Sequence, residues 1–356
     1  MPISLLTLLV PELLWPEPED REALDNLECP ALATLLARSR LKKRPPQSPE
    51  ASLADMFGHA PGAPYGAFRQ LGENSIVPET DGCGWIAADP VHLRYHQERL
   101  VLADGSTLGI TEEDAKHLAE ELNRYFPDMG CIHVAAPDRW YIELAQQAVL
   151  ARLDAIPPLS TVAGRSIDEL LQEITQDRAM RGLLNEIQTF LHAHPVNRRR
   201  ESAGLLPINS LWLWGAGSLP PRIESDFDGV WSTDPLARGL ARAAGVPIHP
   251  QPVDAESLFK HTAPDTRHLV VLDDLLGPVQ YENGNAYRTA LASLEARWFA
   301  PLQKALASGT ITHLRIEATT AYAALSWESR RIDLWRFWRN RRPLSEIART
   351  MAKDSR

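Results

Sequence analysis

The most informative segment of the chain is Gly182–Pro221, GLLNEIQTFLHAHPVNRRRESAGLLPINSLWLWGAGSLPP. Its first part predicts a helix, because apolar side chains recur at spacings of three and four residues, namely Leu183, Leu184, Ile187, Phe190 and Leu191. Pro195 lacks an amide hydrogen and moves His194 out of the helical region, so we expect the helix to end there. The apolar run at 210–214 predicts a buried strand, and the glycines within 215–217 predict a tight turn after it.

Composition and charge narrow the class of protein. The chain has 356 residues, of which 44% are hydrophobic and 23% charged, as is usual for a globular protein with one large core or one core and a smaller domain. The net charge of −9 argues against nucleic acid as a partner, because binding to a phosphate backbone needs a basic face. No apolar run is long enough to span a bilayer, so we expect no membrane partner either.

Two further features predict a cytoplasmic chain. The first residues, MPISLLTLLV, lack a positively charged region and a cleavage site, so we expect a buried strand over Ile3–Val10 rather than a signal peptide. The three cysteines, Cys29, Cys83 and Cys131, are far apart and have no metal-ligand spacing, which is typical of a reduced chain.

The order of the predicted elements divides the chain. Between residues 84 and 150 we expect two strands, a helix that begins after Thr111, and two more strands, which together form a small α+β module. After residue 165 strands and helices alternate, which is typical of a mostly parallel sheet covered by helices. The expected strands are 210–214, 228–232, 268–273 and 311–317, and the expected helices are 234–244, 285–308 and 331–340. We therefore predict an α/β domain formed by 1–83 and 165–345, an inserted α+β module at 84–164, and a tail at 346–356.

Two groups of residues at predicted strand ends qualify as sites, and each has a structural alternative. Gly215 and Gly217 resemble the start of a dinucleotide-binding turn, but Pro220 stands where that fingerprint requires a third glycine, so a structural turn is the better interpretation. Asp273 and Asp274 follow another predicted strand, where carboxylates bind metals or act in acid–base chemistry, or else cap the next turn. The sequence leaves these roles of the two aspartates equally open.

The segment 330–342, RRIDLWRFWRNRR, combines six arginines with three large aromatic side chains. Such a mixture can stack on and neutralise nucleic acid. An amphipathic helix with Leu334, Trp335 and Trp338 packed against the sheet explains the same residues, and we favour packing because the whole-chain charge is negative. An acidic protein partner is a further alternative.

One string of residues resembles known families. It consists of Asn185-Glu186, His194-Pro195-Val196-Asn197, Arg200, Gly204, Pro207, Asn209 and Gly215-Ala216-Gly217. The chain resembles the bacterial regulatory proteins called RpfE type over most of its length. More distantly, it resembles the archaeal cofactor-independent phosphoglycerate mutases, which belong to the alkaline phosphatase-like superfamily. The resemblance implies an alkaline phosphatase-like α/β fold with an inserted module.

The same resemblance implies a catalytic centre that this chain has lost. Those mutases use two divalent metals and a serine or threonine nucleophile. Here Pro11-Glu12 replaces the first metal-binding aspartate and its glycine, Pro61–Gly66 contains no serine or threonine, and the histidines expected after Asp273-Asp274 and Glu317 are missing. We therefore expect no catalytic residues, no metal and no cofactor, although the sequence leaves open a residual cation at Asp273, Asp274 and Glu317. The predicted function is regulation or binding by a catalytically degenerate phosphoglycerate mutase-like protein. The alternative is an active metal-dependent mutase or phosphatase.

The residues expected to bind a ligand are His194, Asn197, Arg200, Asn209, Gly215 and Gly217. A turn with free amides beside one arginine can hold an oxyanion, so the expected ligand is a phosphorylated small molecule. The alternative is that Asn197 and Asn209 only bond loop backbone.

Overall fold

The computed structural model describes residues 2–24, 27–59, 62–73, 84–144 and 156–354. Pro61 and Cys83, both named above, lie outside these ranges. The chain forms two compact units. The parallel-sheet unit consists of Met1–Gly58, Glu224–Ala237 and Ala244–Arg356, and the antiparallel-sheet unit of His59–Ile223 and Arg238–Ala243.

A seven-stranded sheet organises the parallel-sheet unit, with the strand order β2-β12-β11-β1-β10-β8-β9. The parallel strands are β1 (Ile3–Leu9), β8 (Gly229–Trp231), β9 (Ile248–His249), β10 (Arg267–Val271) and β11 (Ile311–Thr319). On the β11 side of the sheet, β12 (Ala324–Arg330) pairs antiparallel with β11, and β2 (Arg40–Arg44) pairs antiparallel with β12. Leu8 of β1 is opposite both Val270 and Ile316. The apolar run of β1 is therefore the centre of the sheet, as expected for a parallel strand buried on both faces.

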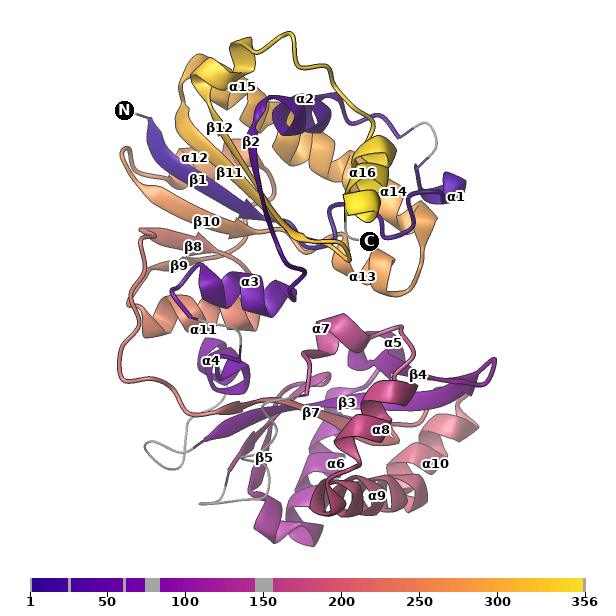
Figure 1. Ribbon diagram of the computed structural model, residues 1–356. Coiled ribbons are helices and arrows are strands. Elements are labelled where there is room, and N and C mark those ends of the chain that lie inside the picture. The colour runs from indigo at the N-terminus through magenta and orange to yellow at the C-terminus, as the bar shows by residue number, and fades with distance from the viewer. Residues whose placement is uncertain (1, 25–26, 60–61, 74–83, 145–155, 355–356) are drawn as a thin grey trace. The chain divides into compact units, whose positions relative to one another are not determined.

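Helices cover this sheet, and the predicted mixed α/β class with a mostly parallel sheet is confirmed (Figure 1). Leu6 and Leu8 belong to one apolar core together with side chains from the helices around them. These helices are α1 (Arg21–Leu24), α2 (Pro30–Arg38), α12 (Ala255–His261), α13 (Leu276–Gln280), α14 (Gly284–Leu294), α15 (Ala300–Ser308) and α16 (Leu344–Asp354). The unit also contains α3 (Pro49–Asp55), and α11 (Pro235–Ala243) is divided between the units after Ala237.

The N-terminus of α2 is capped by a side chain from a distant part of the chain. Cys29, which precedes α2, makes no side-chain capping bond. The carboxylate of Glu295 instead accepts hydrogen bonds from the amides of Ala31 at 2.6 Å and Leu32 at 3.0 Å, at the positive end of the helix dipole. Glu295 begins the π-helical turn Glu295–Phe299 between α14 and α15, so the helix predicted over 285–308 is continuous but locally widened. Burial and the nearby Glu295 raise the pKa of the Cys29 thiol to about 12.

The second sheet is antiparallel in every pair, with the order β4-β3-β6-β5 and with β7 also paired to β3. Its strands are β3 (Trp85–His96), β4 (Arg99–Asp104), β5 (Cys131–Ala136), β6 (Arg139–Glu143) and β7 (Ser210–Gly217). The prediction that 210–214 belongs to the parallel sheet is wrong, because Ala88 of β3 pairs with Leu213. An apolar run indicates a buried strand but does not specify its neighbour.

The helices of this unit confirm two local predictions. They are α4 (Tyr65–Gly72), α5 (Gly105–Leu108), α6 (Glu112–Tyr125), the 3₁₀ turn η1 (Pro127–Met129), α7 (Leu159–Val162), α8 (Asp168–Ile174), α9 (Arg178–Ala193) and α10 (Pro195–Ser202). The hydroxyl of Thr111 accepts a hydrogen bond from the amide of Asp114 at 3.1 Å and so caps α6. Pro195 is the first residue of α10, and His194 ends α9 as predicted.

The predicted module at 84–164 lies entirely within the antiparallel-sheet unit, which also includes 59–83 and 165–223. The boundaries proposed from the sequence, with 1–83 and 165–345 in one domain, stay a prediction. Within the described residues, every helix is too short or too polar to cross a bilayer.

Candidate functional site

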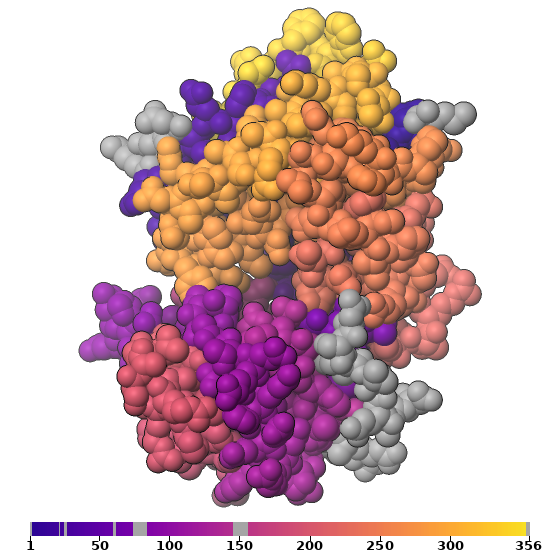
Figure 2. Space-filling model, turned by 180° about the vertical axis from the view of Figure 1, so that it is seen from behind, coloured from indigo at the N-terminus to yellow at the C-terminus, as the bar shows by residue number. Residues whose placement is uncertain are grey.

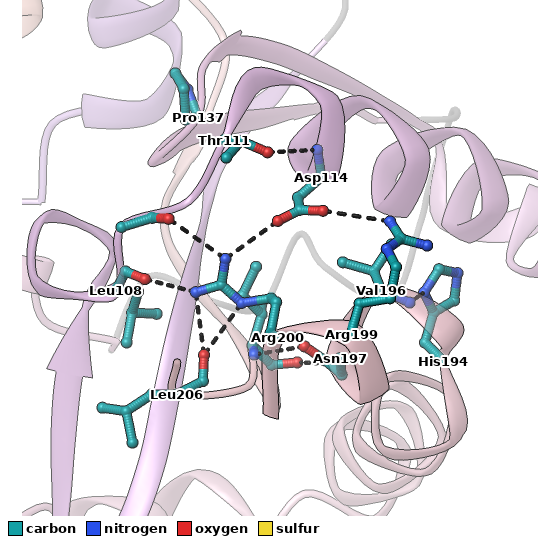
Figure 3. A network of polar contacts seen from close by, with 12 residues as sticks. Leu108, Thr111, Asp114, Pro137, His194, Val196, Asn197, Arg199, Arg200 and Leu206 are labelled. Carbon is teal, nitrogen blue, oxygen red and sulfur yellow. Dashed lines mark hydrogen bonds and ion pairs between the residues drawn. The ribbon is translucent and has the colours of Figure 1, made fainter. Parts of the chain in front are cut away.

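Arg200 is the centre of a polar network between α5, α6 and α10. It is 2% exposed. Its Nη1 lies 3.2 Å from Oδ2 of Asp114, its Nη2 donates to the carbonyl oxygen of Leu108 at 2.5 Å, and its Nε and Nη2 both donate to that of Leu206 at 3.1 Å. Figure 3 shows the guanidinium enclosed by these acceptors. The cation is therefore directed at protein groups, and Asp114 balances its charge.

The two predicted asparagines each bind backbone with both ends of the amide. Asn197 donates to the carbonyl oxygens of Leu191 at 2.7 Å and Ile208 at 2.6 Å, and accepts from the amide of Ile208 at 2.8 Å. Asn209 accepts from the amide of Leu93 and donates to its carbonyl oxygen, both at 2.8 Å. An asparagine side chain supplies one acceptor and two donors, so it can bind both backbone amides and backbone carbonyl oxygens, as it does here. Both asparagines thus bond backbone, but that of β3 for Asn209 and partly that of α9 for Asn197, rather than of loops alone as the alternative expected. Ligand binding by them stays a prediction.

His194 is buried at the junction of α9 and α10, beside a surface cavity. Its Nδ1 accepts from the amide of Val196 at 3.2 Å, and its Nε2 lies 3.0 Å from Oε2 of Glu121. The cavity has a volume of about 500 Å³, and its wall includes Glu121, Tyr125, Asn185, Glu186, Phe190 and His194. The Phe190 ring centre is 5.4 Å from that of His194 and 5.1 Å from that of Tyr125. Two carboxylates and aromatic rings suit a cationic group better than a phosphate.

The sequence reasoning missed this cavity, although Asn185 and Glu186 belong to the string that carries the family resemblance. Both side chains are exposed on α9. The available signal was that these two polar residues belong to the shared string and lie on the exposed side of a helix, where packing does not account for them.

Gly215 and Gly217 allow a close approach between strand and helix. The predicted tight turn after the strand is wrong, because both residues still belong to β7. Their φ angles are +65° and +149°, in the region that favours glycine. A Cβ on Gly215 would lie 2.9 Å from the amide nitrogen of Gly66, and one on Gly217 would lie 2.7 Å from Cβ of Pro64. The two glycines therefore let β7 contact the start of α4.

An ion pair with a buried carboxylate, also missed from the sequence, joins α4 to β3. Nη1 of Arg69 donates to both carboxylate oxygens of Asp89 at 2.8 Å, and the Trp214 indole donates to one of them at 2.9 Å. The Arg69 guanidinium lies 5.4 Å from the ring centres of Tyr141 and Trp214. Burial raises the pKa of Asp89, and the charge of Arg69 opposes that shift. These residues are distant in sequence and no spacing rule joins them.

In the parallel-sheet unit, acidic residues follow the strands at the edge where the parallel strands end, here called the carboxyl edge. They are Glu12 after β1, Asp234 after β8, Asp273 and Asp274 after β10, and Glu317 in β11. In an open α/β sheet this edge is where ligands usually bind.

Arginine and serine side chains hold two of these acids. Oε1 of Glu317 accepts from the Ser326 hydroxyl at 2.7 Å, and Arg44 lies 3.5 Å from Oε2. Asp274 forms an ion pair with Arg297 at 3.0 Å. Burial raises the pKa of Glu317, and the Ser326 hydroxyl and the charge of Arg44 oppose that shift.

In the described part of the chain, no three or more His, Cys, Asp or Glu side chains are grouped so that they could hold a metal ion. Within Pro61–Gly66, where the resemblance places a nucleophile, Tyr65 and Gly66 begin α4. The amide of Gly62 donates to the hydroxyl of Tyr65 at 3.4 Å.

Sheet order, helical cover and the second unit define an α/β protein with the fold of cofactor-independent phosphoglycerate mutases, which is alkaline phosphatase-like. The solved structure of the cofactor-independent phosphoglycerate mutase from Thermoplasma acidophilum has a TM-score of 0.51 and 16% sequence identity, and the alignment covers 100% of both chains. At this identity the likeness shows the fold alone.

Sequence comparison shows that the chain is related to phosphoglycerate mutase-like proteins. It is 31% identical over 150 residues to the 2,3-bisphosphoglycerate-independent phosphoglycerate mutase of Methanothrix thermoacetophila, which covers 41% of this chain and 37% of that one. It is 28% identical over 229 residues to a probable enzyme of the same name from Geobacter sulfurreducens, which covers 60% of this chain and 54% of that one. The chain thus spans about half the length of these relatives, or less. No family model matches it.

Proposed function

We propose that this protein is a catalytically degenerate phosphoglycerate mutase-like protein with a regulatory or binding role, as the resemblance to RpfE-type regulators implies. The observation that supports it best is the state of the acids at the carboxyl edge. Glu317 and Asp274 are engaged by Ser326 and Arg297. Each of these two acids therefore already has a partner within the protein.

The chemistry of the related mutases explains why such losses matter. Two metals activate the nucleophile and stabilise the charge on the phosphoryl oxygens, so all parts must be present together. Loss of one member of a catalytic unit removes most of the rate. In this chain the nucleophile segment, the first acid and two histidines all differ from the pattern of the family.

A binding role fits the residues that the chain keeps. The shared string builds the network around Arg200 and contributes Asn185, Glu186 and His194 to the cavity wall. A phosphorylated small molecule stays a prediction for the predicted ligand residues, and 3-phosphoglycerate is the probe. Protection of the chain against thermal unfolding by this compound, and its loss in Asn209→Ala, would support that part of the proposal.

The deciding experiment is an assay of mutase and phosphatase turnover with manganese or magnesium. An archaeal phosphoglycerate mutase serves as the positive control. We expect the wild-type chain and the Asp273→Ala, Asp274→Ala double variant to show the same background rate. Metal-dependent turnover that disappears in the double variant would show that the protein is an active enzyme and would overturn the proposal.

A further inference from the structure

Large apolar side chains are exposed together near the end of the chain. Ten such side chains are exposed in the described residues, and four of them lie within 332–338. Ile332 is 74% exposed, Trp335 71%, Phe337 74% and Trp338 67%. The expectation that Trp335 and Trp338 pack against the sheet is therefore wrong. Exposed apolar side chains gathered in this way usually mark an interaction surface.

Arginines surround these side chains. The segment 330–342 has six arginines and a single acidic residue, Asp333. Five of the arginines are exposed, and four of these, Arg331, Arg339, Arg341 and Arg342, lie next to the apolar side chains or follow them in the chain. We call the set the aromatic–arginine patch; it consists of Arg331, Ile332, Trp335, Phe337, Trp338, Arg339, Arg341 and Arg342. Figure 2 shows the C-terminal part of the chain, in yellow, at the surface of the molecule.

The backbone of the patch is firmly held, so its exposure does not result from a loose tail. The predicted helix 331–340 is only a short 3₁₀ turn, η4 (Arg331–Trp335). Asp333 is buried, accepts from the amide of Arg330 at 2.8 Å, and pairs with Arg336 at 2.8 Å.

The same segment is also hydrogen-bonded to residues at the end of α2. Arg38 donates to the carbonyl oxygen of Leu334, and Arg339 donates to that of Ser39 at 2.9 Å. Leu334 packs against the core of the unit. These anchors turn Leu334 inward and leave its aromatic neighbours outside. A preorganised surface of this kind loses little conformational entropy when it binds.

We propose that the aromatic–arginine patch is a docking surface for an acidic segment of another protein. Tryptophan and arginine are the residues most enriched among those that dominate protein interfaces. The arginines supply charge complementarity to glutamate and aspartate, and the rings supply apolar area and faces for stacking. Arg330, just before the patch, is opposite His313 near the start of β11, whereas Glu317 is near the end of that strand, so the proposal does not depend on whether the acids of the carboxyl edge are catalytic.

The charge of the remainder of the chain decides between an acidic protein segment and larger anionic partners. The whole chain carries −9, although the segment 330–342 is strongly basic. A nucleic acid or an anionic membrane extends beyond the patch and meets the acidic remainder of the chain. A short acidic segment needs to meet only the patch.

The test uses the full-length protein and a fluorescent synthetic peptide that alternates glutamate with leucine and phenylalanine. We expect binding, measured by fluorescence anisotropy, that weakens as salt rises. Trp335→Ala with Trp338→Ala should weaken binding by at least about tenfold, and so should Arg341→Glu with Arg342→Glu. The matched control is Arg94→Glu with Tyr95→Ala, an exposed arginine and an exposed ring on β3, which should bind like wild type.

Several outcomes would overturn the proposal. One is a dissociation constant for the peptide weaker than about 1 mM. Another is equal binding by the wild type and the Trp335→Ala, Trp338→Ala variant when both melt at the same temperature. Tighter binding of oligodeoxythymidine or of phosphatidylserine vesicles would assign the patch to nucleic acid or membrane. Self-association in sedimentation velocity that the tryptophan substitutions abolish would assign it to a second copy of the chain.

Discussion

Arg200 and Asp114 form an ion pair between α10 and α6, with Nη1 3.2 Å from Oδ2. Asp114 stands in the first turn of α6, and its own amide bonds the capping hydroxyl of Thr111. The pair therefore joins the first turn of α6 to the last turn of α10, which lies far along the chain. It gives Arg200 a structural role that does not need a ligand.

Arg200→Ala should lower the free energy of unfolding by about 3–5 kcal/mol, because it leaves Asp114 and several carbonyl groups without the buried cation. Urea unfolding measures this change. The matched control is Arg199→Ala, since Arg199 has a 58% exposed side chain and lies 3.4 Å from the same aspartate. That variant should lose less than about 1 kcal/mol. Equal losses in the two variants would contradict the structural role of Arg200.

Gly66→Ala should lower the free energy of unfolding by about 1–3 kcal/mol through overpacking. A Cβ at this position would lie 2.7 Å from the amide nitrogen of Ala87 and 2.8 Å from the carbonyl oxygen of Gly215. These are backbone atoms, which have little freedom to move. In contrast, a Cβ on Gly182 in α9 would have no atom within 4 Å, so Gly182→Ala should stabilise the chain by about 0.5–1 kcal/mol. Thermal unfolding of both variants tests the contact between α4 and β7, and a neutral Gly66→Ala would rule it out.

Acidification should destabilise the protein through His268. Its Nδ1 accepts from the Trp231 indole at 3.2 Å, and its Nε2 lies 2.8 Å from the hydroxyl of Thr266, so the neutral ring fits this site. Burial lowers the pKa of His268 below its usual value of 6.5. The contribution of the neutral His268 ring to the free energy of unfolding is fully present above pH 6.5 and is lost as the pH falls toward the pKa of the folded state.

The melting temperature of the wild type should therefore fall more steeply between pH 7 and pH 5 than that of His268→Gln, over a range of roughly two pH units. His96→Gln, at an exposed position of β3, is the control and should keep the slope of the wild type. If His268→Gln also keeps that slope, the neutral ring is not the cause.

Glu317 should act on stability with the opposite sign. Burial raises its pKa above the usual value of 4.5, so the folded chain holds this proton more tightly than the unfolded chain. The resulting stability is complete below pH 4.5 and is lost as the pH rises through the folded-state pKa. Glu317→Gln keeps an acceptor for Ser326 but has no proton to lose. The free energy of unfolding of Glu317→Gln should therefore increase relative to that of the wild type as the pH rises from 4.5. The exposed Glu256→Gln should show no such gain, and equal profiles of all three proteins would contradict the prediction.

Local features of the fold could be read from the sequence, because they depend on neighbouring residues. Pro195 ends α9 at His194, Thr111 caps α6, and the apolar run of β1 is buried at the centre of a sheet. Each of these depends on the geometry of a few adjacent residues, or on burial alone.

Features that depend on distant neighbours could not be predicted. The run at 210–214 is as apolar as a parallel strand, but it pairs antiparallel with β3. Arg69 and Asp89 meet only because α4 packs on β3. Trp335 and Trp338 have helical spacing, but the anchoring of Asp333 ends the helix early and leaves both rings exposed. The site shares this limit, since Asn197 and Asn209 were recognised as important residues while their backbone partners were not.

The central position of β1 has a consequence for synthesis on the ribosome. This strand is translated long before its two neighbours, since β11 follows it by roughly 300 residues. At about 5–20 residues per second, Ile3–Leu9 waits roughly 15–60 s for that partner. During this time an apolar strand with two unpaired edges is open to other nascent chains, so the protein should depend on chaperones that hold the β1 segment until β11 has been synthesised.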